Sequence, residues 1–251
     1  MLPVPARLTG RPWAFFLDVD GTLLDIADAP DLVRVDARVR DVLGGLERAS
    51  AGAVALVSGR SIADLDALFA PLRLPAAGLH GAERRDAAGR LHLHPVDPRL
   101  DSVRAGLRAW SQAHSGTLVE DKGAAIALHY RGALASEAEA RSLVERLVQG
   151  LGDGFVMQEG KCVLEIKPSG VSKATAIREF LDEIPFSGHV PVFVGDDITD
   201  EDGFEAVSSV GGLAIAVGDR PSRHARYRLP EVASVLDWLG RYVDESGVNE
   251  A

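Results

Sequence analysis

Cysteine is nearly absent from this chain, which has one, Cys162, among 251 residues. A single thiol cannot form a disulfide within the chain, which favours a reducing compartment, and we expect a cytoplasmic protein. Long hydrophobic runs are also missing, since none approaches the roughly 20 residues of a membrane span. The N-terminal sequence shows no basic segment followed by a long apolar one, so it predicts no secretory signal.

Basic residues are in deficit as well. The chain has 27 Lys and Arg against 37 Asp and Glu, which gives a net charge of −10 at pH 7. Such a protein repels phosphate backbones, and we expect no nucleic-acid partner and no membrane partner. A small anionic substrate is still compatible with this charge if the site has its own Lys and Arg. Repeats at the periods of solenoid proteins are absent as well. We expect a monomer.

Apolar sequence is plentiful, because 46% of the residues are hydrophobic. Short apolar runs at 13–19, 53–59 and 76–81 predict buried strands, and amphipathic helices are predicted over 31–49 and after Ser61. The alternation resumes with a helix capped by Ser172, the strand VPVFVGDD, a helix from about Thr199, the strand LAIAV and a last helix. This order predicts an α/β core with a doubly wound, Rossmann-like parallel sheet.

The middle of the chain has a different pattern. ERRDAAGRLHLH is typical of a hairpin, and then come a helix over 98–114, two strands, a helix over 136–150 and two more strands. This order predicts a small antiparallel sheet with helices on one face. We therefore expect a core domain formed by residues 1–96 and 169–251, with an inserted, smaller α+β cap domain at 97–168.

Polar and acidic residues stand where the predicted core strands end. They are Asp18 and Asp20 after the first strand, Ser58, Gly59 and Arg60 after the second, Lys173 after the insert, and Asp196, Asp197 and Asp200 after VPVFVG. In open α/β sheets, ligands bind beyond these carboxyl ends. Converging carboxylates repel each other, and a hard divalent cation such as Mg²⁺ relieves that repulsion while it binds a substrate phosphate.

The spacing of Asp18 and Asp20 suggests that the two aspartates have different catalytic roles. An extended backbone sends Asp18 and Asp20 to the same side. One ionised aspartate can attack phosphorus to give an aspartyl-phosphate, and the other can protonate the leaving oxygen and later activate water. We expect Ser58 and Lys173 to hold the phosphoryl oxygens.

Taken singly, each of these signals has an ordinary structural explanation. A lone DxDG occurs in calcium loops, but the EF-hand alternative fails because Phe16 and Ala27 would occupy ligand positions. A Ser-Gly-Arg triplet is commonly a plain loop, and the run DDITDED suits a solvated helix start. The order of all these groups, each at a strand or helix end, favours a site.

Four motifs resemble those of the haloacid-dehalogenase (HAD) phosphatase superfamily: LDVDGTL, LVSGR, the helix-opening Lys173 and VGDDITDED. GLHGAE, VEDKGAAIALHYR, GKCVLEIKPSGVSK and FVGDDITDEDGF further resemble the trehalose-6-phosphate phosphatases, over nearly the whole chain. The resemblance implies Asp18 as nucleophile and Asp20 as general acid/base. It implies Mg²⁺ on Asp18, the backbone carbonyl of Asp20 and Asp196, with Asp197 and Asp200 in support.

The insert carries paired polar residues on three predicted strands. Period-two alternation places together Glu120 with Lys122, His129 with Arg131, and Glu165 with Lys167. Cross-strand ion pairing on a solvated face is one explanation. The resemblance favours sugar recognition by these six residues, and we expect Gly59 and Arg60 to contact the substrate as well. We expect this face to close over the strand ends of the core, with hinges near Pro95–Pro98 and Pro168–Gly170.

Together with these patterns, the resemblance implies a Mg²⁺-dependent phosphatase that converts trehalose 6-phosphate to trehalose and phosphate. A close alternative is a phosphatase of the same superfamily for another sugar phosphate, such as sucrose phosphate or mannosyl-glycerate phosphate. A non-catalytic sugar-phosphate sensor is a third, but a binding protein has no need of an acid/base at Asp20. A sugar-nucleotide transferase is a fourth alternative, which the sequence disfavours because it contains no Gly-rich phosphate loop.

Overall fold

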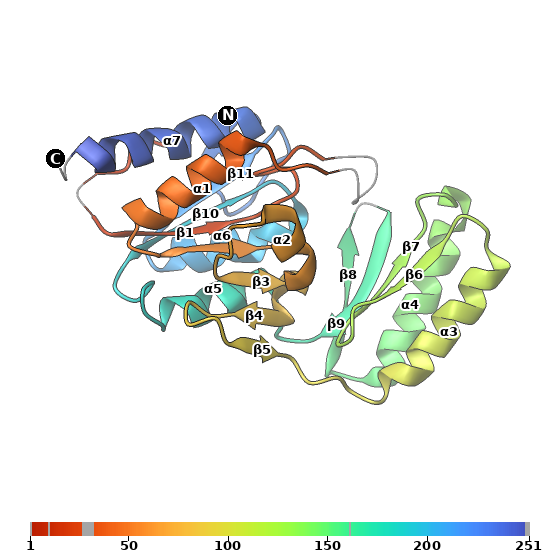
Figure 1. The fold of residues 1–251 in the computed structure, drawn as a ribbon. Helices are drawn as coiled ribbons and strands as arrows, with labels where there is room; N and C mark the ends of the chain where they lie inside the picture. The colour runs from red at the N-terminus through yellow and green to blue at the C-terminus, as the bar shows by residue number, and fades with distance from the viewer. Residues whose placement is uncertain (1, 10, 27–32, 161, 249–251) are drawn as a thin grey trace. The chain divides into compact units, whose positions relative to one another are not determined.

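A computed structural model describes residues 2–9, 11–26, 33–160 and 162–248 (Figure 1). The chain divides into two compact units, Met1–His92 with Ser172–Ala251, and Leu93–Val171. Each unit is described by itself below. In the part of the chain that the structure covers, no helix has the length and apolar character needed to cross a membrane.

The first unit is built on an eight-stranded sheet of order β12-β11-β10-β1-β2-β3-β4-β5. Its strands are β1 Trp13–Leu17, β2 Val54–Val57, β3 Ala76–Gly78, β4 Glu83–Arg85, β5 Leu91–Leu93, β10 Val190–Gly195, β11 Leu213–Val217 and β12 Tyr227–Leu229. From β12 to β3 neighbouring strands are parallel, and β4 joins β3 antiparallel. The parallel sheet predicted from the sequence is confirmed.

Helices cover both faces of this sheet. They are α1 Ala37–Ala49, α2 Ile62–Phe69, α5 Lys173–Leu181, α6 Glu201–Ser209 and α7 Val232–Val248. Phe15 packs in the apolar cluster formed with α1, α2 and α7, whereas its neighbour Phe16 packs in the cluster formed with α5 and α6. Alternate residues of β1 thus enter opposite layers, which explains why the whole strand is apolar.

Three details differ from the sequence prediction. The helix expected from residue 31 begins at Ala37, because Asp36 accepts a hydrogen bond from the Val39 N–H and caps it there; residues 31 and 32 lie outside the described part. The third strand ends at Gly78, where a tight turn follows. β12 was not predicted, since it has only three residues and lies at the sheet edge.

The second unit is a four-stranded antiparallel sheet with two helices on one face (Figure 1). The strands β6 Leu118–Asp121, β7 Ile126–His129, β8 Phe155–Gly160 and β9 Val163–Pro168 lie in the order β6-β7-β9-β8, and the helices are α3 Leu100–Ala113 and α4 Glu137–Leu151. Ile126, Leu128, Leu164 and Ile166 face the helices. The opposite face of the sheet carries the polar residues.

Candidate active site

The end of β1 places Asp18 beside the neighbouring strand β10. The Asp18 N–H donates to the Val194 carbonyl at 3.0 Å, and the Asp18 side chain is buried. Gly21 then turns the chain with φ +83°, and a Cβ at this position would lie 2.2 Å from Asp196 Oδ2. Only a glycine fits, because the turn after β1 presses directly on the carboxylate that follows β10.

The loop after β10 is organised around Asp200, which is fully buried. Its Oδ2 accepts hydrogen bonds from the N–H groups of Asp196 and Asp197 at 3.0 and 2.9 Å. A Cβ on Gly195 would lie 2.5 Å from Asp200 Cγ, so this glycine also permits a close approach. Asp200 therefore shapes the loop that presents Asp196.

Lys173 links the two strand ends. It is the first residue of α5, whose start is fixed by a reciprocal cap between Ser172 and Thr175. Its Nζ lies 2.6 Å from both Asp18 Oδ1 and Asp200 Oδ1. Burial by itself lowers the pKa of a lysine, but the two carboxylates outweigh it and raise the pKa of Lys173. The ammonium group therefore stays charged.

The carboxylates outnumber this one cation. Oxygens of Asp18, Asp196 and Asp200 all lie within 4.8 Å of one another. Burial first, and then the neighbouring Asp200 and Asp196, raise the pKa of Asp18 well above its usual value, although Lys173 opposes this. Burial and the charges of Asp200 and Asp197 raise the pKa of Asp196 to about 6. Three ionised carboxylates around the Lys173 ammonium hold more negative charge than that ammonium compensates.

A divalent cation suits this arrangement. Three ionised carboxylates and one ammonium leave two negative charges uncompensated, and the two positive charges of Mg²⁺ would balance them. Asp196 Oδ1 is buried and receives no hydrogen bond from any residue in the described part of the chain. An acceptor oxygen in that position is suited to a metal ion. Asp197 lies outside the cluster of three and contributes its N–H to Asp200.

The end of β2 brings in the general acid/base candidate. β2 runs parallel to β1 with Leu56 opposite Leu17, so the residues after both strands emerge at one edge of the sheet. Buried Ser58 accepts a hydrogen bond from the Arg60 N–H at 3.1 Å. Arg60 Nε and Nη2 each donate to an Asp20 carboxylate oxygen at 2.7 Å. The sequence led us to expect that Arg60 contacts the substrate, whereas in the structure its guanidinium is hydrogen-bonded to Asp20.

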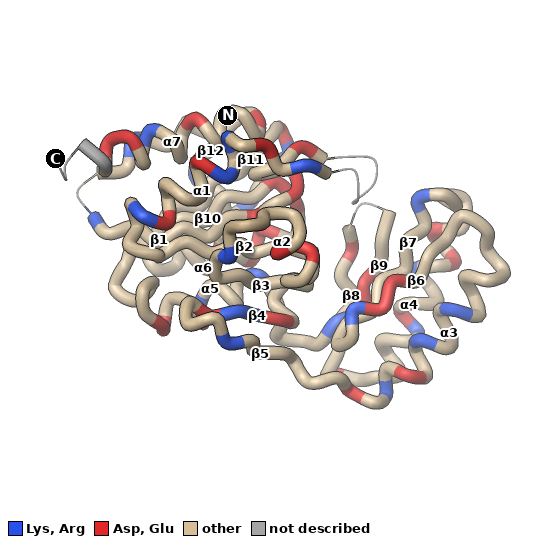
Figure 2. Tube along the Cα trace, in the orientation of Figure 1, with Lys and Arg blue, Asp and Glu red and all other residues tan. Residues whose placement is uncertain are grey.

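The polar face of the second unit contains its own ion pairs. Glu120 and Glu165 stand in one row, since each pairs in register with Ala127. His129 Nε2 lies 2.8 Å from Glu120 Oε2, and this hydrogen bond lowers the pKa of Glu120. Lys122 Nζ donates to Glu165 Oε2 at 3.2 Å. Figure 2 marks the acidic and basic positions of these strands.

Lys167 and Arg131 are the other two residues of the second unit that were predicted to recognise the sugar. Lys167 is buried, and alternation along β9 puts it on the same face as Glu165. Arg131 is not on β7, which ends at His129. The Ala133 N–H donates to the Tyr130 carbonyl at 2.8 Å and closes a turn. Alternation therefore does not determine the direction of the exposed Arg131 side chain.

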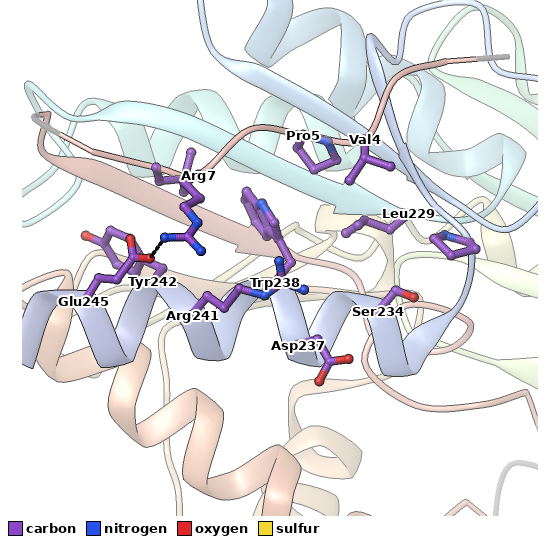
Figure 3. Close-up of a pocket in the computed structure, with 12 residues that line it drawn as sticks. Val4, Pro5, Arg7, Leu229, Ser234, Asp237, Trp238, Arg241, Tyr242 and Glu245 are labelled. Atoms are coloured by element: carbon purple, nitrogen blue, oxygen red, sulfur yellow. Dashed lines mark ion pairs between the residues drawn. The ribbon is translucent and has the colours of Figure 1, made fainter.

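A hollow of about 270 Å³ lies elsewhere, between the N-terminal segment and α7 (Figure 3). Its walls include Val4, Pro5 and Trp238, and Arg7 pairs with Glu245 at 2.9 Å beside it. None of the site residues predicted from the sequence lines this hollow. The buried carboxylates and lysine at the strand ends, where phosphate chemistry can occur, are the better candidate site.

Sequence reasoning missed two features of the site. One is Arg60 as the partner of Asp20, which no spacing in the sequence reveals because the two lie 40 residues apart. The other is Gly195. A glycine directly before an acidic pair is a sign of close packing, and that signal could have identified Gly195.

Comparisons with known proteins agree with this geometry. The family model described as trehalose-phosphatase matches residues 16–232. A trehalose-6-phosphate phosphatase of Escherichia coli (strain K12) is 44% identical over 228 residues, which cover 90% of this chain and 85% of that protein. A crystal structure of a trehalose-6-phosphate phosphatase related protein has a TM-score of 0.76 at 26% identity, covering 95% of this chain and 100% of that one.

A more distant neighbour shares the fold alone. It is a phosphatase of the HAD enzyme superfamily from Bacteroides thetaiotaomicron, with a TM-score of 0.66 at 17% identity, covering 95% of this chain and 96% of that one. The α/β core with an inserted α+β unit is thus a fold that this neighbour shares.

Proposed function

Because the chain belongs to the trehalose-phosphatase family, we propose that it is a Mg²⁺-dependent enzyme that hydrolyses trehalose 6-phosphate to trehalose and phosphate. The observation that carries the proposal is the position of Lys173, whose ammonium joins Asp18 to Asp200 next to Asp196. We place the reaction in the cytoplasm, which the lone Cys162 supports.

In the first step, an Asp18 carboxylate oxygen attacks phosphorus, and the bond from phosphorus to the sugar oxygen breaks. Asp20 donates a proton to that leaving oxygen, so trehalose departs as a neutral alcohol and Asp18 carries the phosphoryl group. Ser58 and Lys173 donate hydrogen bonds to the phosphoryl oxygens. The two hydrogen bonds from Arg60 hold the Asp20 carboxyl in a single orientation.

In the second step, Asp20 removes a proton from a water molecule, and the water oxygen attacks the same phosphorus. The bond between phosphorus and Asp18 breaks, which releases phosphate and restores both aspartates. Asp18, Asp196 and the backbone carbonyl of Asp20 would hold Mg²⁺, with Asp197 and Asp200 in support. The bound ion supplies positive charge that offsets the charge on the phosphoryl oxygens.

The polar face of the second unit is proposed to recognise the sugar. Carboxylates and cations that already form hydrogen-bonded pairs, such as Glu120 with His129 and Lys122 with Glu165, can exchange those bonds for sugar hydroxyls. The six proposed recognition residues are Glu120, Lys122, His129, Arg131, Glu165 and Lys167. Gly59, in the loop after β2, is proposed to contact the substrate as well.

Replacing Glu120 or Arg131 by alanine is expected to raise KM for trehalose 6-phosphate by about 10-fold, because one hydrogen bond to a charged group is lost. Hydrolysis of p-nitrophenyl phosphate, which has no sugar, should stay within about 2-fold of wild type. Steady-state kinetics with both substrates distinguish the roles, and Glu145→Ala, at an exposed position of α4, is the matched control. Equal losses on both substrates would contradict sugar recognition.

The function itself is tested by phosphate release from a panel of sugar phosphates, with Mg²⁺ and after its removal by a chelator. We expect turnover only with Mg²⁺ and a higher kcat/KM for trehalose 6-phosphate than for sucrose phosphate or glucose 6-phosphate. If another sugar phosphate is the better substrate, the enzyme class holds and the substrate is wrong. If no phosphate is released from any of them, the proposed phosphatase activity is refuted and the sugar-phosphate-binding protein becomes the favoured alternative.

A further inference from the structure

The segment between β3 and β4, residues 78–83 with the sequence GLHGAE, has no part in the chemistry proposed above. This 78–83 link has an unusual backbone. Leu79, His80 and Gly81 have φ values of 50°, 56° and 104°, so two residues with side chains adopt a left-handed conformation in succession. Such a backbone is unfavourable and persists only where surrounding contacts enforce it.

The backbone of the link binds the loop after β2. The Leu79 N–H donates to the Arg60 carbonyl, and the His80 N–H donates to the Ser58 carbonyl, both at 2.9 Å. The left-handed turn is what points two successive N–H groups at this loop. The loop carries the proposed phosphate ligand Ser58 and the partner of Asp20, Arg60.

A side chain at the far end of the link binds the same loop. The Glu83 carboxylate accepts a hydrogen bond from the N–H of Ile62, the first residue of α2. Gly78 packs tightly against Glu83 and Ile62, because a Cβ there would lie 2.6 Å from Glu83 Oε1 and 2.8 Å from the Ile62 nitrogen. The loop after β2 is thus held at both of its ends.

The link also presses on the start of α5. A Cβ on Gly81 would lie 2.6 Å from the Ser172 carbonyl oxygen, and Ser172 is the cap residue next to Lys173. On the other side, a Cβ on Gly59 would lie 2.7 Å from His80 Nε2, so the imidazole packs on that glycine. One short segment therefore touches both chain stretches that support Asp18 and Asp20, the two aspartates after β1.

We propose that the 78–83 link is a positioning element that holds the loop after β2 and the start of α5 at a constant spacing, and that Glu83 is its principal anchor. Arg60 on the loop orients Asp20, and Lys173 at the start of α5 contacts Asp18. The link thereby fixes the position of the acid/base Asp20 relative to the nucleophile Asp18. This inference rests on the proposed function, because the spacing matters only if both aspartates act on one phosphorus.

The test compares Glu83→Ala with Glu83→Gln, using p-nitrophenyl phosphate at saturating Mg²⁺. Glu83→Ala is expected to lower kcat by about 10-fold or more with KM within about 3-fold, because the loop shifts while binding persists. Glu83→Gln keeps an acceptor oxygen for the Ile62 N–H and should restore kcat to within about 3-fold of wild type. Glu205→Ala on α6 is the matched control, since Glu205 is exposed and belongs to neither supported stretch.

A second variant examines the other end of the link. Gly81→Ala should lower kcat similarly by displacing Ser172, whereas Gly89→Ala, also at positive φ but with open space around it, should not. Wild-type kcat in folded Glu83→Ala or Gly81→Ala would overturn the proposal, as would equal losses in Glu83→Ala and Glu83→Gln. An inactive wild type would instead reject the proposed function.

Discussion

Asp18→Asn is expected to abolish turnover of trehalose 6-phosphate, with kcat falling by about 10⁴-fold or more, as occurs when a catalytic nucleophile is removed. The amide is a poor nucleophile, and it also removes one of the two carboxylates that Lys173 contacts. Steady-state phosphate release measures the loss. Intact-mass analysis of rapidly quenched enzyme should detect an added phosphoryl group in wild type and none in the variant.

Asp25→Asn is the matched control, because Asp25 follows the same turn but is exposed and lies outside the carboxylate cluster. It should retain wild-type kcat and the trapped phosphoryl group. Full turnover by Asp18→Asn would refute covalent catalysis at this residue. A lost phosphoenzyme combined with partial turnover would point to direct attack by water.

Gly21→Ala is the second change expected to have a large effect. The new Cβ would lie 2.2 Å from Asp196 Oδ2, so either the turn after β1 or the loop after β10 must move. Metal binding and the attack of Asp18 on phosphorus both depend on placing the carboxylates after β1 and β10 to within about an ångström. We therefore expect kcat/KM to fall by at least about 100-fold. The Mg²⁺ concentration for half-maximal activity should rise as Asp196 is displaced.

Gly89→Ala separates this clash from backbone strain. Gly89 has φ +81°, close to the +83° of Gly21, but a Cβ there meets nothing within 4 Å. Both variants should lose about 1–2 kcal/mol of unfolding free energy from the left-handed backbone. Thermal or urea unfolding measures that loss. Only Gly21→Ala should lose activity, and equal activity in the two would refute the close approach to Asp196.

Much of the fold could be predicted because it depends on local pattern. Fully apolar runs such as that around Phe15 and Phe16 indicate strands buried on both faces, and the structure shows those two residues in opposite layers. Helix boundaries were less accurate. The cap made by Asp36 decides where α1 begins, and the apolar spacing of Val33 and Val35 alone does not reveal it.

The same distinction between local pattern and tertiary contacts applies to the candidate site. Asp18, Asp20 and Lys173 were predictable because each follows or opens an element whose end is visible in the sequence. The contact of Arg60 with Asp20 and the end of β7 before Arg131 were not, because they depend on how separate loops meet.

By itself, the amino-acid sequence determined the chemistry available to this protein: which carboxylates stand at strand ends, that one lysine accompanies them, and that a second unit interrupts the core. Only the tertiary structure decided which groups pair. Lys173 lies 155 residues from Asp18 in sequence and 2.6 Å from it in space. The physical reason is that parallel strands bring distant chain segments to one edge, where burial makes each charge depend on the nearest opposite charge rather than on its neighbours in sequence.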